Sequence, residues 1–259
     1  MVINADQAAP PSATLLMLEG RALWEFSAFM ASLPALQFTR RGDGHPVFVL
    51  PGLIASDMST RPLRAFLAHH GYRSYGWELG RNYGPRNGVE ERMLERLRAL
   101  RKQYGRKVSL IGWSLGGIYA RELAKQAPED VRLVITLGSP FKGNPKATNA
   151  WRLYELTSGR RVDDPLSYHP KRGSPPPVPV TAIYSRTDGV VAWQCCREEP
   201  GPFRENIEVH GSHCGLGHHP AAVYAIADRL SQPEGEWRQF DSSGVKRLLY
   251  PDPNRSASV

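Results

Sequence analysis

The sequence predicts an α/β protein with a mostly parallel, six-stranded sheet covered by helices on both faces. Three observations support this fold class. The predicted strands are short, largely apolar runs, these runs alternate with segments of helical periodicity, and one run breaks into Gly-Trp-Ser-Leu-Gly before a helix. Strands that are apolar throughout and alternate with helices are typical of a parallel sheet buried on both faces.

The 259 residues are enough for one large α/β domain, and nothing in this length requires two. We expect one domain over residues 1–259, with a helical extension over 1–40, a cap-like insertion over 141–179 and a tail over 232–259. The 41% hydrophobic and 22% charged content excludes disordered and fibrous classes.

The N-terminal extension is predicted to contain an amphipathic helix that is broken near Glu19, Gly20 and Arg21. Its apolar residues are Leu15, Leu16, Leu18, Leu23, Trp24 and Phe26. This pattern favours packing on the body of the protein over insertion into lipid. Contact with a lipid surface remains an alternative.

Six apolar or alternating runs are the predicted strands, over residues 47–50, 73–77, 107–113, 131–137, 180–184 and 206–210. The first predicted connecting helix has Thr60 as its cap and Gly71 at its end, which are typical start and stop residues. Apolar residues at helical spacing predict another helix over 88–104. The remaining helices are expected over 118–126, 147–157 and 220–230.

Ser114 is the strongest candidate catalytic residue. It lies at the predicted strand-to-helix turn, where a strained elbow would raise its hydroxyl above the sheet edge. Gly112 and Gly116 flank it at positions where a Cβ would collide with neighbouring backbone. We therefore expect Ser114 to be a nucleophile.

A serine nucleophile needs a base, and the base needs a carboxylate that orients it. Reacting groups of an open parallel sheet gather at the carboxyl ends of its strands. His213 follows the last predicted strand and Asp188 follows the strand before it, so these two are the expected base and acid. Asp163 and Asp164 are rivals, but they lie in the insertion with no strand before them.

The developing oxyanion of an acyl transfer needs two N–H donors. We expect the main-chain amides of Leu53, after the first strand, and Leu115, after the serine, to supply them. Trp113, Trp151 and Tyr154 are candidates for the substrate pocket, although each is also an ordinary core residue. Arg81 and Asn82 should lie near the pocket rim, where loop structure is favoured over substrate contact.

Other chemistries have weaker support. The net charge of +8 is spread over helix faces without stacking aromatics, which argues against nucleic-acid binding. The histidines and cysteine of residues 210–219 suggest a zinc site, but they lack paired ligand groups elsewhere, so no metal is expected. A disulfide from Cys214 to Cys195 or Cys196 and reduced thiols both remain open.

Three ordered segments together resemble the α/β-hydrolase family, and most closely its small bacterial lipases and esterases. Residues 183–191 and 209–216 are similar to the acid and histidine segments of those lipases, and residues 135–140 to the strand end after their nucleophile helix. The order Ser114, Asp188, His213 is the order of that family. Pro51, where many relatives have histidine, and Leu115, where small lipases often have methionine, depart from its pattern.

The resemblance implies a serine hydrolase that cleaves carboxylic esters through an acyl-enzyme, without a cofactor. A small-molecule or lipid ester is the expected substrate. The alternatives are an acyltransferase or thioesterase on the same fold, or a binding module without catalysis. No apolar run is long enough to span a membrane and no signal peptide is evident, so we expect a soluble, cytoplasmic protein; the oligomeric state stays open.

Overall fold

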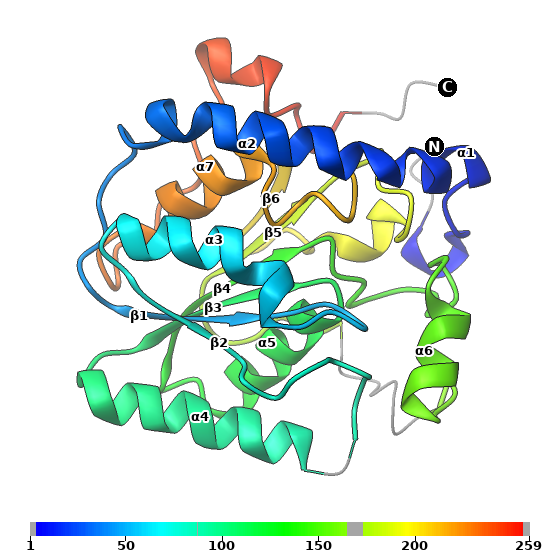
Figure 1. Ribbon diagram of the computed structural model, residues 1–259, viewed down its shortest axis with the longest axis horizontal. Helices are drawn as coiled ribbons and strands as arrows, with labels where there is room; N and C mark the ends of the chain where they lie inside the picture. Colours follow the sequence, from blue (N-terminus) through cyan, green and yellow to red (C-terminus); the bar gives the residue numbers. More distant parts are fainter. Residues whose placement is uncertain (1–3, 87, 165–172, 256–259) are drawn as a thin grey trace.

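The computed structural model describes residues 4–86, 88–164 and 173–255 and is built around one parallel sheet (Figure 1). Its six strands lie in the order β2-β1-β3-β4-β5-β6, and every neighbouring pair is parallel. The strands are β1 Pro46–Leu50, β2 Arg73–Gly76, β3 Val108–Trp113, β4 Val131–Leu137, β5 Val180–Tyr184 and β6 Arg204–Glu208. The predicted fold class is confirmed.

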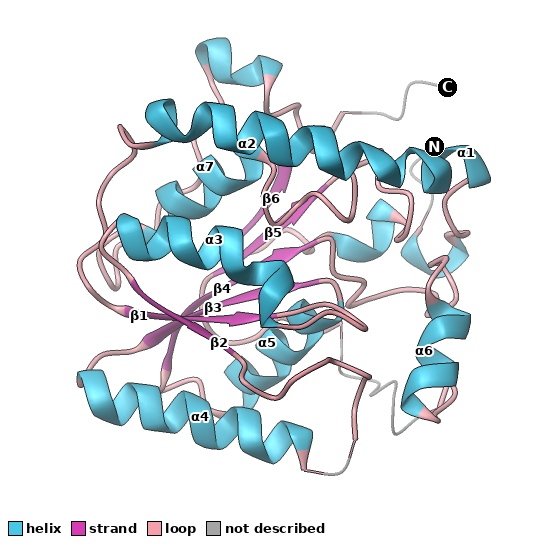
Figure 2. Ribbon diagram, viewed as in Figure 1, coloured by secondary structure: helices cyan, strands magenta, loops and turns pink. Residues whose placement is uncertain are grey.

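Helices cover both faces of the sheet (Figure 2). Three of them share a hydrophobic core on one face: α2 Ala22–Leu36, α3 Asp57–His69 and α7 Pro220–Leu230. The opposite face is covered by α4 Val89–Tyr104 and α5 Leu115–Gln126. The sheet is therefore the middle of three layers, as its apolar strands predicted.

The central strands show why the apolar runs lack the alternation of polar and apolar residues that a sheet with one exposed face would have. In the parallel register, Leu110 lies opposite Val134 and Ile111 lies opposite Ile135. Leu110 and Val134 belong to the core under α4 and α5, whereas Ile111 and Ile135 belong to the core under α2, α3 and α7. Successive side chains point to opposite faces, and both faces are buried.

The N-terminal segment runs through α1 Ala13–Met17 and a 3₁₀ turn over Leu18–Arg21 into α2. The predicted break near Glu19 coincides with this turn. α2 continues to Leu36, beyond the apolar pattern that predicted it, because Phe29 and Leu36 are buried in the core.

Some predicted boundaries are wrong. The cap of α3 is Ser56, whose Oγ accepts a hydrogen bond from the Met58 amide at 3.4 Å. Thr60 lies inside that helix and donates to the Asp57 carbonyl. β6 begins and ends two residues earlier than predicted, because it pairs with β5 from Arg204 onward.

The insertion after β4 contains α6 Trp151–Ser158. Part of the predicted insertion, residues 165–172, lies outside the described residues, and a cap role for 141–179 stays a prediction. No helix in the described part of the chain is long and apolar enough to cross a membrane.

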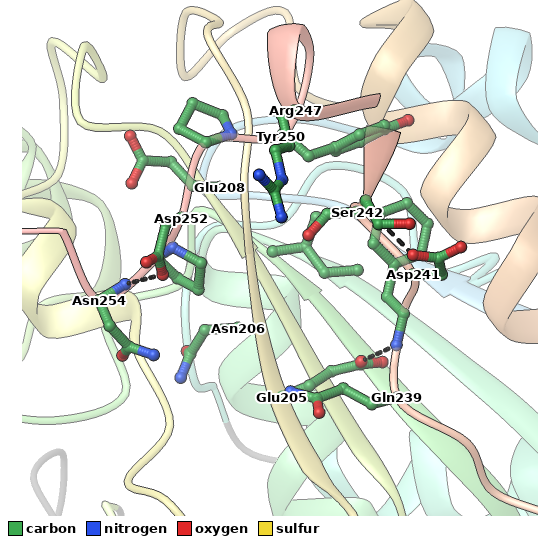
Figure 3. A pocket seen from close by; sticks show the side chains of 15 residues that line it. Glu205, Asn206, Glu208, Gln239, Asp241, Ser242, Arg247, Tyr250, Asp252 and Asn254 are labelled. Carbon is green, nitrogen blue, oxygen red and sulfur yellow. Dashed lines mark hydrogen bonds between the residues drawn. The ribbon is translucent and has the colours of Figure 1, made fainter. Parts of the chain in front are cut away.

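The C-terminal segment packs beside the edge strand β6 and includes the 3₁₀ turn Gly244–Leu248. The Phe240 amide donates to Glu205 Oε2 at 2.7 Å, and the Tyr250 hydroxyl donates to the Ala221 carbonyl at 2.9 Å. Figure 3 shows the pocket of about 320 Å³ between this segment and β6, whose lining is largely polar and includes none of the predicted site residues.

Candidate active site

Ser114 lies between β3 and α5 in a conformation that L residues rarely adopt, with φ 54° and ψ −120°. The turn is tight enough to exclude side chains at its glycines. A Cβ on Gly112 would lie 2.2 Å from the Gly117 Cα, and one on Gly116 would lie 2.2 Å from the Leu50 carbonyl oxygen. Such a strained turn is a feature of nucleophile elbows.

Asp188 and His213 lie side by side at the carboxyl ends of β5 and β6. His213 Nδ1 is 2.6 Å from Asp188 Oδ2, and both side chains are buried. The other oxygen of Asp188 accepts hydrogen bonds from the amides of Val190, at 2.8 Å, and Val191, at 2.7 Å. With its carboxylate held in this way, Asp188 can orient the imidazole of His213.

The electrostatics of His213 favour its protonated form. Burial lowers the pKa of this imidazole. The negative charge of Asp188, its hydrogen bond to His213 and the charge of Glu19 together raise the pKa by more than burial lowers it. The pKa therefore lies above its ordinary value of 6.5. An imidazole with a raised pKa binds a proton more readily than an ordinary one.

Ser114 and His213 line the same cavity, which has a volume of about 460 Å³. Most of its other lining residues are apolar: Leu16, Leu53, Ile54, Ala55, Trp113, Ala150, Leu153 and Val190. Apolar walls around a few polar groups are typical of a small-molecule site.

The two expected oxyanion donors lie next to the serine. Leu115 is the first residue of α5, and Leu53 lines the cavity after Gly52. A Cβ on Gly52 would lie 3.2 Å from the Ser114 Cβ, so this loop passes directly beside the serine. Main-chain N–H groups at these positions can bind a developing oxyanion.

Asn82 supports the loop after β1 that carries Leu53, a role that sequence reasoning missed. Asn82 is fully buried, and its side-chain Nδ2 donates a hydrogen bond to the Pro51 carbonyl at 2.8 Å. Its main-chain carbonyl accepts a hydrogen bond from the Ile54 amide at 2.6 Å. Ile54 has a positive φ of 54°, so these bonds hold a strained turn. The only sequence signal was its place after a strand, which predicted loop structure.

Gly138, after β4, packs against the histidine and carboxylate pair. It has a positive φ, and a Cβ there would lie 3.0 Å from His213 Nδ1 and 3.1 Å from Asp188 Oδ2. Any side chain at this position would therefore displace the pair. Sequence reasoning noted the segment but gave this glycine no role.

The structure places only one of the three predicted pocket aromatics in the cavity wall. Trp113 lines the cavity, and its Nε1 donates to the His213 carbonyl at 3.0 Å. Trp151 instead contacts Lys146 and Arg152, and Tyr154 packs on the core under α4 and α5. The helix α6 reaches the cavity through Leu153, because residues 151 and 154 lie on its other faces.

A second cluster of serine, histidine and aspartate lies at the amino ends of the strands, away from the cavity. His45 Nδ1 is 2.5 Å from Asp43 Oδ1, and His45 Nε2 is 2.8 Å from Ser109 Oγ. His45 and Ser109 are fully buried. Burial and the charge of Arg132 lower the pKa of His45 to about 4, so it is neutral and braces the sheet.

All three cysteines lie in the described part of the chain, and none forms a disulfide. Cys195 and Cys196 are buried, whereas Cys214 is exposed in the cavity wall. Although part of this residue is exposed, desolvation of its thiol in the cavity wall and the carboxylate of Glu19 raise the pKa of the Cys214 thiol to about 12. Among the described residues, no group of three or more His, Cys, Asp and Glu side chains is placed to hold a metal ion.

Comparison with known proteins identifies the family to which this chain belongs. A family model described as "Alpha/beta hydrolase family" matches residues 42–249. A search of curated proteins finds no match.

Solved structures share the fold at low sequence identity. Lipase B of Aspergillus fumigatus has a TM-score of 0.57 at 16% identity, over 73% of this chain and 52% of the fungal chain. Lipase BlEst2 of Bacillus licheniformis has a TM-score of 0.55 at 15% identity, over 73% and 93%. A monoacylglycerol lipase of Paleococcus ferrophilus has a TM-score of 0.51 at 15% identity, over 71% and 96%. This chain thus spans about half of the fungal lipase.

Proposed function

The chain belongs to the alpha/beta hydrolase family, and we propose that it is a carboxylic ester hydrolase in which Ser114, His213 and Asp188 form a catalytic triad. One observation carries this proposal. The carboxylate-bound imidazole of His213 and the strained Ser114 line one apolar cavity. The lipases and esterases among its structural neighbours agree with ester chemistry.

In the proposed mechanism, Ser114 Oγ attacks the ester carbonyl carbon while His213 Nε2 takes the hydroxyl proton. Asp188 holds the opposite nitrogen and stabilises the imidazolium that forms. The amides of Leu53 and Leu115 bind the oxyanion of the tetrahedral intermediate. His213 then donates its proton to the leaving alcohol. In the second half of the reaction His213 takes a proton from water, the water oxygen attacks the acyl carbonyl carbon, and the acid is released as Ser114 Oγ takes the proton back from His213.

The cavity supports an ester with an apolar acyl group. Its wall is mostly apolar, and its few polar side chains include those of Ser114 and His213. No aspartate, glutamate, lysine or arginine side chain lines it among the described residues. Since an unpaired charge is costly to bury, a neutral ester fits this cavity better than a charged acyl group.

Contact with a lipid surface is a further part of the proposal. Beyond Leu16, which lines the cavity, the N-terminal segment exposes Met17, Leu23 and Trp24, with 83%, 77% and 79% of their surfaces accessible. The net charge of +8 would attract this face to anionic lipid.

Labelling with a fluorophosphonate probe and mapping of the labelled residue test the triad directly. We expect label on Ser114, turnover of p-nitrophenyl esters by the wild type, and loss of both in Ser114→Ala. Removal of a triad nucleophile lowers kcat by on the order of 10⁶-fold.

Ser109→Ala is the matched control, because Ser109 lies in β3, the strand that leads into the elbow, and contacts a histidine that does not line the cavity. This variant should retain labelling at Ser114 and ester turnover. A folded wild-type protein that neither labels nor hydrolyses any ester of the series would refute the proposal and favour a binding module.

A further inference from the structure

The N-terminal segment, which precedes the part matched by the family model, contacts both loops that carry the acid and the base. Glu19 lies in the 3₁₀ turn before α2. Its Oε1 accepts hydrogen bonds from the amides of Gly189, at 2.7 Å, and His213, at 2.9 Å. Its Oε2 accepts from the amide of Cys214 at 2.8 Å. One carboxylate therefore joins the loop after β5 to the loop after β6.

Two neighbours of Glu19 strengthen the same connection. Arg21 Nη2 donates to the Thr187 carbonyl at 2.6 Å, next to Asp188. Glu25 accepts from both the amide and the hydroxyl of Ser212, at 2.8 and 2.5 Å, next to His213. Arg21 and Glu25 also pair with each other at 3.3 Å.

The glycines of these two loops show that the contact is close. A Cβ on Gly189 would lie 2.2 Å from the Leu15 carbonyl oxygen. A Cβ on Gly215 would lie 1.6 Å from Glu25 Oε2. The N-terminal segment thus occupies the space that any side chain at these positions would need.

We propose that Glu19 is a positioning residue that holds the Asp188 and His213 loops in register through its three main-chain hydrogen bonds. The inference rests on the proposed function, because it assigns Glu19 a part in the same triad. Without Glu19, the two loops would keep the hydrogen bond between His213 and Asp188 and the connection through Arg21 and Glu25. They would lose the one carboxylate that accepts hydrogen bonds from both backbones.

Glu19 also influences the protonation of His213 through its negative charge. Its own pKa is lowered because three amide donors outweigh the effect of its partial burial, so it is ionised at neutral pH. The charged groups that face His213 are Asp188 from the β5 loop and Glu19 from the N-terminal turn, with Glu25 and Arg21 beside them. A negative charge on Glu19 stabilises the imidazolium that forms during attack.

The test compares Glu19→Gln, which removes the charge and turns a donor toward the Cys214 amide, with Glu19→Asp, which keeps the charge on a shorter stem. We expect Glu19→Gln to lower kcat about 10- to 100-fold with little change in KM. The acid limb of its kcat/KM profile should move to lower pH. Glu19→Asp should lose part of kcat but keep the position of that limb.

A second readout does not depend on ester hydrolysis. Glu19 raises the pKa of the exposed Cys214 thiol, so Glu19→Gln should speed alkylation of Cys214 by iodoacetamide at mildly alkaline pH. Hydrogen exchange at the amides of residues 189, 213 and 214 should also become faster. These measurements still report on the contact if the wild type proves to have no esterase activity.

Glu205→Gln is the matched control. Glu205 is buried and accepts a hydrogen bond from the main-chain amide of Phe240 at 2.7 Å. Like Glu19 it connects a terminal segment to the sheet, but it does so at the amino end of β6, away from the cavity. It should lower thermal stability without moving the pH profile or the Cys214 alkylation rate. If Glu19→Gln behaves like this control, or like the wild type within twofold in all readouts, the positioning role is overturned.

Discussion

Ser114 and Ser109 lie five residues apart on β3 and its elbow. Ser109 contacts His45, which contacts Asp43, whereas Ser114 shares a cavity with His213, which contacts Asp188. Their surroundings differ. His213 lines a cavity and is biased toward protonation, whereas His45 is fully buried and has a pKa of about 4. Residue types alone do not make a triad, because the base also needs access to substrate and a suitable pKa.

The raised pKa of His213 predicts the pH dependence of activity. The base must be neutral to accept the serine proton, so kcat/KM should fall as the pH drops through a value above 6.5. Asp188→Asn should lower kcat by on the order of 10⁴-fold, because the imidazole loses its orienting acceptor. The acid limb of the remaining activity should move to lower pH, since a raising charge is gone.

A pH series of steady-state rates with a short p-nitrophenyl ester checks this expectation. Asp163→Asn is the control, since Asp163 is the rival carboxylate and pairs with Arg161 and Lys146 instead. An Asp188→Asn enzyme with wild-type rates, or an Asp163→Asn enzyme that loses them, would contradict the assignment of the acid.

At the scale of elements, α6 closes one side of the cavity. Leu153 lines the wall, and the neighbouring Leu156 on the same helix is 82% exposed. The sequence predicted this helix, but its aromatic residues Trp151 and Tyr154 do not line the wall, whereas the predicted Trp113 of β3 does. Helical phase relative to the cavity depends on how α6 packs, which its local sequence does not specify.

Leu153→Trp should fill part of the cavity and so limit the length of the acyl chain. We expect kcat/KM for long-chain p-nitrophenyl esters to fall about tenfold or more, while the acetate is turned over at nearly the wild-type rate. Leu156→Trp, which adds the same bulk outside the cavity, should leave both rates unchanged. Equal loss on all chain lengths in Leu153→Trp would mean that the acyl group binds elsewhere.

At the scale of the whole molecule, the N-terminal segment that contributes Leu16 to the cavity wall also exposes Met17, Leu23 and Trp24. Replacing Leu23 and Trp24 together by serine should weaken binding to an emulsified ester about tenfold or more, because their apolar surface no longer enters the lipid. Activity on a dissolved short ester should be unchanged. Parallel assays on the two substrate forms measure this difference.

The control pair is Val245→Ser with Leu248→Ser, which removes equally exposed apolar residues from the C-terminal 3₁₀ turn. Their loss should affect neither substrate. If both pairs reduce emulsion activity alike, adsorption is a general property of the surface rather than of the N-terminal segment.

The sequence by itself determined the strands, the helices on both faces and the serine elbow. These features are local, since an apolar run, a helical period and flanking glycines each specify their own backbone. Chain order then predicted that the residues after β5 and β6 would meet, because carboxyl ends of parallel strands share one edge. The assignment of Ser114, Asp188 and His213 as a triad stays a prediction until activity is measured.

Only the tertiary structure decided what surrounds that site. Glu19 lies 170 residues from Gly189 and 194 from His213, and Asn82 lies 31 from Pro51, so no local pattern links them. Gly138 and Leu153 likewise owe their places to the packing of separate elements. Such contacts form when the whole chain folds, because hydrogen bonds between distant residues depend on the complete three-layer packing.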